Sequence, residues 1–169
     1  MASVRDSPVD AHDAHELLAE YFRSRTEGFA ELDVEYTTTF PAPAAFVPPA
    51  GVFLVLDDDE GRPAGCGGIR HIADGPSGTR YEVKHLYLRP QTRGRGWGRL
   101  LIDTLESRAR ELGARELVLD THHSLEAAAA LYARTGFVAI DRYNDNPNAS
   151  RWYGKVLTPA SERMPGQTG

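Results

Sequence analysis

Residues 82–101 read EVKHLYLRPQTRGRGWGRLL, and they predict the central strand and helix of the fold. The first part, Glu82 to Leu88, is an apolar, β-favouring run that indicates a strand. Pro90 should end this strand, because proline cannot donate a hydrogen bond to a neighbouring strand. From Trp97 to Leu112, apolar residues recur near helical spacing, which predicts an amphipathic helix.

Between the predicted strand and helix lies a turn rich in glycine and arginine, residues 93–98 (RGRGWG). The first N–H groups of a helix have no partner inside the helix, and the helix dipole adds partial positive charge there. Glycines let the backbone approach a phosphate closely, and arginines add full positive charges. Together these features predict an anion site, and the expected anion is a pyrophosphate.

Two common phosphate-binding motifs do not fit the spacing G-x-G-x-G, because a dinucleotide fingerprint needs G-x-G-x-x-G and a P-loop needs G-K-[ST]. The segment resembles the central motif of the GNAT superfamily of acyl-CoA-dependent N-acyltransferases, [QR]-x-x-G-x-[GA], which is matched by Arg93, Gly96 and Gly98. A second segment, residues 117–137 (LVLDTHHSLEAAAALYARTGF), is similar to the later family motif, a strand followed by A-x-x-L-Y-x-x-x-G-[FY]. The resemblance covers roughly residues 50–157.

The resemblance implies an α/β (α+β) fold, with a mixed, twisted sheet of six or seven strands flanked by about four helices. The chain's own pattern agrees, because strands alternate with helices in its second half after a hairpin at residues 51–72. A length of 169 residues fits a single domain over residues 1–169, with a flexible tail at 158–169. In the first half, the sequence predicts a weak strand within 1–9, a helix from an Asp10 cap to about Arg25, and loops at 28–50 and 73–79. In the second half, it predicts strands at 117–121, 137–140 and 151–157, and a helix over 125–135 capped by Ser124.

In the family, the glycine-rich loop holds the pyrophosphate of acetyl-CoA, and the preceding strand hydrogen-bonds the pantetheine arm through its backbone. The resemblance also implies that the backbone N–H of Leu88 polarises the thioester carbonyl, where a splay between two strands would free it. Many relatives carry an asparagine where this chain has Leu125. The expected coenzyme-binding residues are Leu86, Tyr87, Leu88, Arg93, Gly94, Arg95, Gly96, Trp97 and Gly98.

The implied reaction moves an acetyl group from the thioester to a primary amine of a small molecule or peptide by direct attack. An alkylamine has a pKa of about 10.4, so only about 0.1% of it is neutral at pH 7, which costs about 4 kcal/mol unless a base removes the proton. By resemblance, Glu82 is the expected base and Tyr132 the expected acid at the sulfur. The plainer alternatives are a surface carboxylate paired with Lys84 or Arg80, and a packed aromatic side chain.

Other chemistry-bearing side chains have weaker signals. Asp120 and His122 sit at the end of a predicted strand, where open α/β sheets place ligands, so both are alternative bases or acceptor contacts. His122 and His123 should point to opposite faces of that strand, which makes them a poor chelate, and no metal is expected. Cys66, within Gly65–Gly68, is interpreted as a small buried residue rather than a nucleophile.

Composition narrows the class of protein further. A net charge of −5 argues against a field that attracts nucleic acid, although the arginine-glycine loop leaves a nucleic-acid binder as an alternative. One cysteine precludes an internal disulfide and suggests a reducing compartment. No apolar run is long enough to span a membrane, and residues 1–15 have no apolar signal core, so a cytoplasmic protein is expected.

The acceptor pocket should be built from the first helix, residues 28–50 and the loop at 143–149. Glu31, Asp33, Glu35 and the acidic 141–145 region would suit a cationic amine by charge complementarity. A non-catalytic acyl-CoA sensor or regulatory protein stays open as an alternative to the enzyme, and a homodimer is a candidate assembly.

Overall fold

The structure is a computed structural model that describes residues 1–158. Seven strands form one sheet in the order β1-β2-β3-β4-β5-β7-β6, and three α-helices and two short 3₁₀ turns accompany it. All neighbouring strands are antiparallel except β4 and β5. The mixed sheet is therefore confirmed, and residues 1–158 contain three α-helices rather than about four. The elements are β1 (Ser3–Asp6), α1 (His12–Glu31), η1 (Pro43–Phe46), β2 (Gly51–Asp57), β3 (Pro63–Gly75), β4 (Gly78–Leu88), η2 (Pro90–Thr92), α2 (Trp97–Glu111), β5 (Glu116–Thr121), α3 (Glu126–Arg134), β6 (Val138–Ala139) and β7 (Arg151–Val156).

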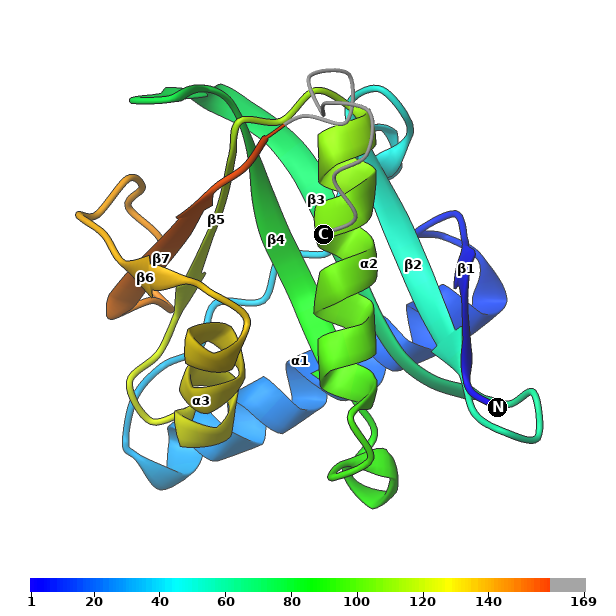
Figure 1. The fold of residues 1–169 in the computed structure, drawn as a ribbon. Coiled ribbons are helices and arrows are strands. Elements are labelled where there is room, and N and C mark those ends of the chain that lie inside the picture. The colour runs from blue at the N-terminus through cyan, green and yellow to red at the C-terminus, as the bar shows by residue number, and fades with distance from the viewer. Residues whose placement is uncertain (159–169) are drawn as a thin grey trace.

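The two long helices cover opposite faces of the sheet, with α2 in front of the strands and α1 behind them (Figure 1). On the α2 face, Leu101 and Leu105 are fully buried against β2, β3 and β4. On the α1 face, Leu17 and Leu18 are equally buried. Because both faces of the sheet are covered, every residue of β2 is buried, and its sequence is a continuous apolar run instead of an alternating one.

The central strand β4 leaves its parallel neighbour and then has a bulge. His85 has a φ of 59°, in the left-handed region, and the register between β3 and β4 shifts beside it. Pairing of β4 with β5 starts at Arg80 opposite Glu116 and ends at Glu82 opposite Val118, although both strands continue. The two strands lie side by side at their beginnings and diverge toward their ends (Figure 1).

Several predicted boundaries are wrong. α1 begins at His12 after an Ala11 cap, not at Asp10, and it runs to Glu31 instead of Arg25 because the buried Phe29 extends its apolar face. The predicted loop at 73–79 is mostly the end of the long β3–β4 hairpin.

The cap of α3 is Leu125 rather than Ser124. The predicted flexible tail lies, apart from Thr158, outside the described residues. Within residues 1–158, no helix is both long and apolar enough to cross a membrane.

Candidate active site

The glycine-rich loop owes its shape to backbone conformations that glycine adopts easily. Gly94 and Gly96 have φ angles of 81° and 79°, and Gly96 is the N-cap of α2. Gly98 serves a different purpose, since a Cβ there would lie 3.2 Å from the Leu131 side chain and 3.5 Å from Leu88. The loop therefore turns at two glycines and lets α2 approach α3 at the third.

A cavity of about 570 Å³ lies between this loop, the end of β4 and α3. Eight of the nine predicted coenzyme-binding residues line it, the exception being Arg95. Arg25, Arg93, Arg99 and Arg134 bring four positive charges to its wall, and Glu126 brings one negative charge. The predicted anion site at the start of α2 is thus accompanied by guanidinium groups that suit phosphate oxygens.

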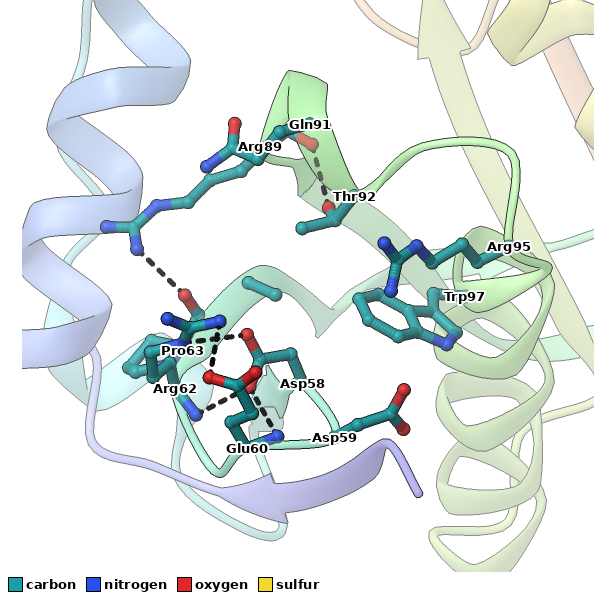
Figure 2. A pocket seen from close by; sticks show the side chains of 11 residues that line it. Asp58, Asp59, Glu60, Arg62, Pro63, Arg89, Gln91, Thr92, Arg95 and Trp97 are labelled. Carbon is teal, nitrogen blue, oxygen red and sulfur yellow. Dashed lines mark hydrogen bonds and ion pairs between the residues drawn. The ribbon is translucent and has the colours of Figure 1, made fainter.

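Arg95 lines a neighbouring cavity of about 460 Å³, between the loop and the turn after β2 (Figure 2). Its guanidinium carbon lies 5.2 Å from the centroid of the Trp97 ring. In the acidic turn, the Asp58 carboxylate accepts the backbone N–H groups of Glu60 and Arg62, each at 2.9 Å, and Arg62 also pairs with Glu60 at 2.8 Å. The acidic side chains of this turn are therefore held by contacts within the turn itself.

The splay between β4 and β5 leaves one edge of β4 open. The N–H of Arg89 donates to the Ala64 carbonyl of β3 at 2.9 Å. Successive residues of a strand direct their N–H groups to opposite edges, so the N–H groups of Leu86 and Leu88 point away from β3. They face the side from which β5 has diverged, and the splay that the resemblance implied is therefore present.

On the other side of the splay from the 570 Å³ cavity lies a second large cavity, of about 560 Å³, which we call the second cavity. It is bounded by α1, residues 36–42, the two diverging strands and residues 144–148. The Asn148 amide closes one side of it by pairing with the Thr37 backbone, donating to the carbonyl at 2.7 Å and accepting the N–H at 2.9 Å. Aromatic side chains form much of the wall, namely Tyr21, Phe22, Phe29, Tyr36 and Phe40.

The two cavities meet, because four residues line both of them: Arg25, Leu86, Leu125 and Tyr132. Tyr132 is buried and packs against Phe137 and Tyr153. Burial raises the pKa of its phenol, and no group within residues 1–158 shares a hydrogen bond with its hydroxyl. Tyr132 is therefore packed, and it also presents a protonated hydroxyl where the cavities join.

Glu82 is 1% exposed and lines neither cavity, so the interpretation of a surface carboxylate is wrong. Its Oε1 accepts hydrogen bonds from Nε of Arg70 at 2.9 Å and pairs with Nη2 of the same residue at 2.8 Å. Its Oε2 accepts the Tyr143 hydroxyl at 2.6 Å, and Lys84 lies 3.6 Å away. Of the two cations predicted beside it, Lys84 is present, whereas the side chain of Arg80 bonds to the Ala73 carbonyl.

Asp120 lines the second cavity and joins the same polar network. It accepts Nζ of Lys84 at 3.1 Å and Nδ2 of Asn144 at 2.6 Å. Asn144 also donates to Glu82 at 3.3 Å, and its own carbonyl accepts the Trp152 indole N–H at 2.8 Å. One asparagine thus bridges the two carboxylates, and the indole fixes which way its amide points.

His122 lies beside Asp120 on the wall of the second cavity, and His123 follows it. The prediction that their rings point to opposite faces is wrong, because both residues follow the end of β5, and their ring centroids are 4.2 Å apart. Burial, followed by the charge of His123, lowers the pKa of His122. Within the described part of the chain, no three His, Cys, Asp or Glu side chains are placed to share a metal ion.

His85, at the bulge, has no signal in the sequence that predicts a functional role, yet its ring lines the second cavity. It packs edge-on against Tyr21 and Phe22. Burial, with smaller contributions from Lys84 and Arg70, lowers its pKa to about 3, so the imidazole is neutral near pH 7.

The buried position predicted for Cys66 is confirmed. The residue has no exposed surface, and burial raises the pKa of its thiol, which donates to the His85 carbonyl at 3.4 Å. The strands around it approach closely, since a Cβ on Gly65 would lie 2.7 Å from the Tyr87 carbonyl oxygen.

The charges predicted for the acceptor pocket are wrong. Glu31, Asp33 and Glu35 are exposed and do not line the second cavity. Of residues 141–145, the one that lines it is Asn144, which is uncharged. The reason is the extra length of α1, which places Glu31 beyond Phe29, the last residue of the helix that lines the cavity, and leaves Asp33 and Glu35 in the exposed segment before Tyr36.

A sheet that splays beside a glycine-rich helix start, with cavities on both sides of the splay, has the architecture of the GNAT fold. The chain belongs to the acetyltransferase (GNAT) family, whose model matches residues 11–137.

Among its relatives is an uncharacterized N-acetyltransferase of Schizosaccharomyces pombe, 33% identical over 140 residues that make up 83% of each chain. Another is the uncharacterized N-acetyltransferase YjgM of Escherichia coli, 28% identical over 139 residues, or 82% of this chain and 80% of the relative. Among solved structures, a GNAT superfamily phosphinothricin acetyltransferase from Sinorhizobium meliloti, in complex with AcCoA, superposes with a TM-score of 0.71 at 20% identity. That match covers 99% of this chain and 94% of the other, and it shows a shared fold.

Proposed function

We propose that this protein is an acetyl-CoA-dependent N-acetyltransferase that transfers the acetyl group to a primary amine of a small molecule or peptide by direct attack. The observation that carries the proposal is the junction of two cavities beside Tyr132, one with a glycine- and arginine-rich loop and the other with a polar network. Family membership and relatives described as N-acetyltransferases support it. A single buried cysteine suits a reducing, cytoplasmic setting.

The coenzyme would bind in the cavity beside α2. The unpaired amides at Gly96 and Gly98 would hold the diphosphate, with positive charge from Arg93 and its neighbours. The open edge of β4 offers the backbone groups of Leu86 and Leu88 to the pantetheine arm. The acetyl-CoA held by the Sinorhizobium relative supports the same ligand here.

The Leu88 N–H is the proposed donor to the thioester carbonyl, because it points into the splay. A fixed amide of this kind stabilises the negative oxygen that develops as the amine attacks. Tyr132 is the proposed acid, since its raised pKa keeps the phenol protonated and able to donate to the departing sulfur.

Glu82 is the proposed base. It lines neither cavity, so it would take the amine proton through a water and not by direct contact. Asp120 is the alternative, because it lines the second cavity, which is the proposed acceptor cavity, and shares Asn144 with Glu82. Replacing each carboxylate separately by its amide distinguishes the two.

The test begins with calorimetry of acetyl-CoA and CoA, followed by release of free thiol with a panel of amines. We expect both ligands to bind in the micromolar range and at least one amine to be acetylated, with the product identified by mass spectrometry. The absence of a binding heat for both coenzyme forms would contradict the proposal. Binding without turnover on any amine would favour the non-catalytic sensor instead.

A further inference from the structure

The charges that line the acceptor cavity do not cancel. Within residues 1–158 its lining includes three cations, Arg25, Arg70 and Lys84, and one carboxylate, Asp120. Lys84 pairs with Asp120 at 3.1 Å, and Arg70 pairs with the buried Glu82 at 2.8 Å. Both histidines on the wall have lowered pKa values and add no charge near pH 7. One positive charge, that of Arg25, is left over.

Arg25 lies on α1, is half-buried, and lines both cavities where they meet. Its guanidinium carbon stands 5.0 Å from the centroid of the Tyr21 ring, and it forms no ion pair with any carboxylate in residues 1–158. A cation between apolar walls acts on a ligand with less screening than it would in open solvent. A guanidinium also matches a carboxylate through two parallel hydrogen bonds.

We infer that the acceptor is an amine with a carboxylate next to the reacting nitrogen, as in an α-amino acid, and with an apolar side chain. In such a molecule one carbon separates the two groups, so a carboxylate held by Arg25 leaves the amine at the junction, beside Tyr132. The apolar side chain then faces the aromatic wall formed by Phe22, Phe29 and Phe40. This inference rests on the proposed function and specifies its substrate.

The experiment compares acids with their amides. Phenylalanine and leucine, each with its carboxamide, are offered with acetyl-CoA to the wild type, to Arg25→Gln and to Arg23→Gln. Arg23 is exposed on the same helix and lines neither cavity, so it is the matched control. The measured quantity is the ratio of kcat/KM for acid and amide, and comparing this ratio between proteins cancels the different basicity of the amines.

We expect the ratio to fall by about 10- to 100-fold in Arg25→Gln, because a charge-assisted hydrogen-bond pair is lost. Arg23→Gln should keep the wild-type ratio. Equal ratios in the wild type and Arg25→Gln would overturn the inference, as would a wild-type preference for a diamine. If Arg25→Gln weakens acetyl-CoA binding and leaves the ratio unchanged, the arginine serves the coenzyme and the inference is also overturned.

A binding measurement decides the matter without turnover. N-acetylphenylalanine and N-acetyl-leucine, with their amides, are titrated by calorimetry into the protein saturated with CoA. The acids should bind more tightly than the amides, and this difference should vanish in Arg25→Gln. No binding of either acid to the wild-type complex overturns the inference, whereas failure of acetyl-CoA itself to bind contradicts the proposed function.

Discussion

The coenzyme cavity and the acceptor cavity share Tyr132, yet the chain builds them in different ways. The coenzyme cavity comes almost entirely from two short stretches, residues 86–99 and 124–134. The acceptor cavity combines α1, residues 36–42, two strands and residues 144–148, and a hydrogen bond between positions 111 residues apart closes it. A site made of contiguous residues depends on local backbone geometry, whereas a site made of distant segments depends on how the whole sheet is assembled.

The largest effect is expected on the acceptor side, from Glu82→Gln. The variant keeps the size of the side chain and removes the proposed base, so kcat should fall by about 100-fold, within the range for a positioned base. Steady-state thiol release measures it. Glu116→Gln is the matched control, because Glu116 is another buried carboxylate on the sheet and lines neither cavity.

If Asp120→Asn loses about 100-fold while Glu82→Gln keeps full activity, the base is Asp120 and the assignment of Glu82 is wrong.

Tyr132→Phe acts where the two cavities meet, and kcat should drop by at least about tenfold because the proton for the leaving sulfur is lost. Acetyl-CoA affinity, measured by calorimetry, should stay within about twofold, since the ring packing is retained. Tyr81→Phe serves as the control, because Tyr81 is a buried phenol that donates to the Pro49 carbonyl at 2.7 Å and lines neither cavity. Unchanged kcat in Tyr132→Phe would leave this residue with a packing role alone.

Gly96→Ala tests the coenzyme side. The φ of 79° costs alanine about 1 kcal/mol, so the loop should relax when free and bind acetyl-CoA about fivefold more weakly. Gly61→Ala is the matched control, because Gly61 has the same φ of 79° in the turn after β2 and an added Cβ would meet nothing within 4 Å. It should therefore lower stability without changing acetyl-CoA affinity. Equal affinity in both variants would mean that the loop conformation does not control binding.

The effect of His85 is absent near pH 7, and it is visible only in acid. Its folded pKa of about 3 lies below the unfolded value of about 6.5, so below pH 6.5 the unfolded chain takes up a proton that the folded chain does not. The free energy of unfolding should therefore fall as the pH drops from 6.5 toward 3, by at most about 1.4 kcal/mol per pH unit from this residue. Lys84 and Arg70 contribute to the low pKa, and Asp120 opposes them.

Urea unfolding at several pH values, with wild type and His85→Phe compared, measures this slope. Phenylalanine retains the contacts with Tyr21 and Phe22 and cannot titrate, so the difference between the two proteins should appear only below pH 6.5. The same slope in both proteins would show that folding does not lower the pKa of His85.

Sequence patterns predicted the parts of this molecule that depend on neighbouring residues. The strand ending near Leu88, the turn at Gly94 and Gly96 and the helix from Trp97 all follow from local rules, and the structure has them. The length of α1 was underestimated because the burial of Phe29 depends in part on a ring far away in the sequence, His122.

The polar network could not be predicted from local patterns, because its members come from separate elements. Arg70 reaches Glu82 as its partner across the β3–β4 ladder, and Asn144 arrives from a loop 62 residues further along the chain. The charge of the acceptor cavity was mispredicted for the same reason, since acidic composition near a site does not show which side chains line it. Arg25, which does line it, has no local signal.

The bulge at His85 changes which face of the sheet the odd- and even-numbered side chains of β4 point to. Before it, the odd-numbered residues Tyr81 and Val83 pack on the α2 side, and after it the even-numbered Leu86 and Leu88 do, while Tyr87 turns to α1. One surplus residue therefore resets the alternation of the strand inside the splay, three residues after pairing with β5 has ended at Glu82. Without the bulge, the same sequence would place Tyr87 where the leucines now are, whereas deleting His85 itself would keep every later side chain on its present face.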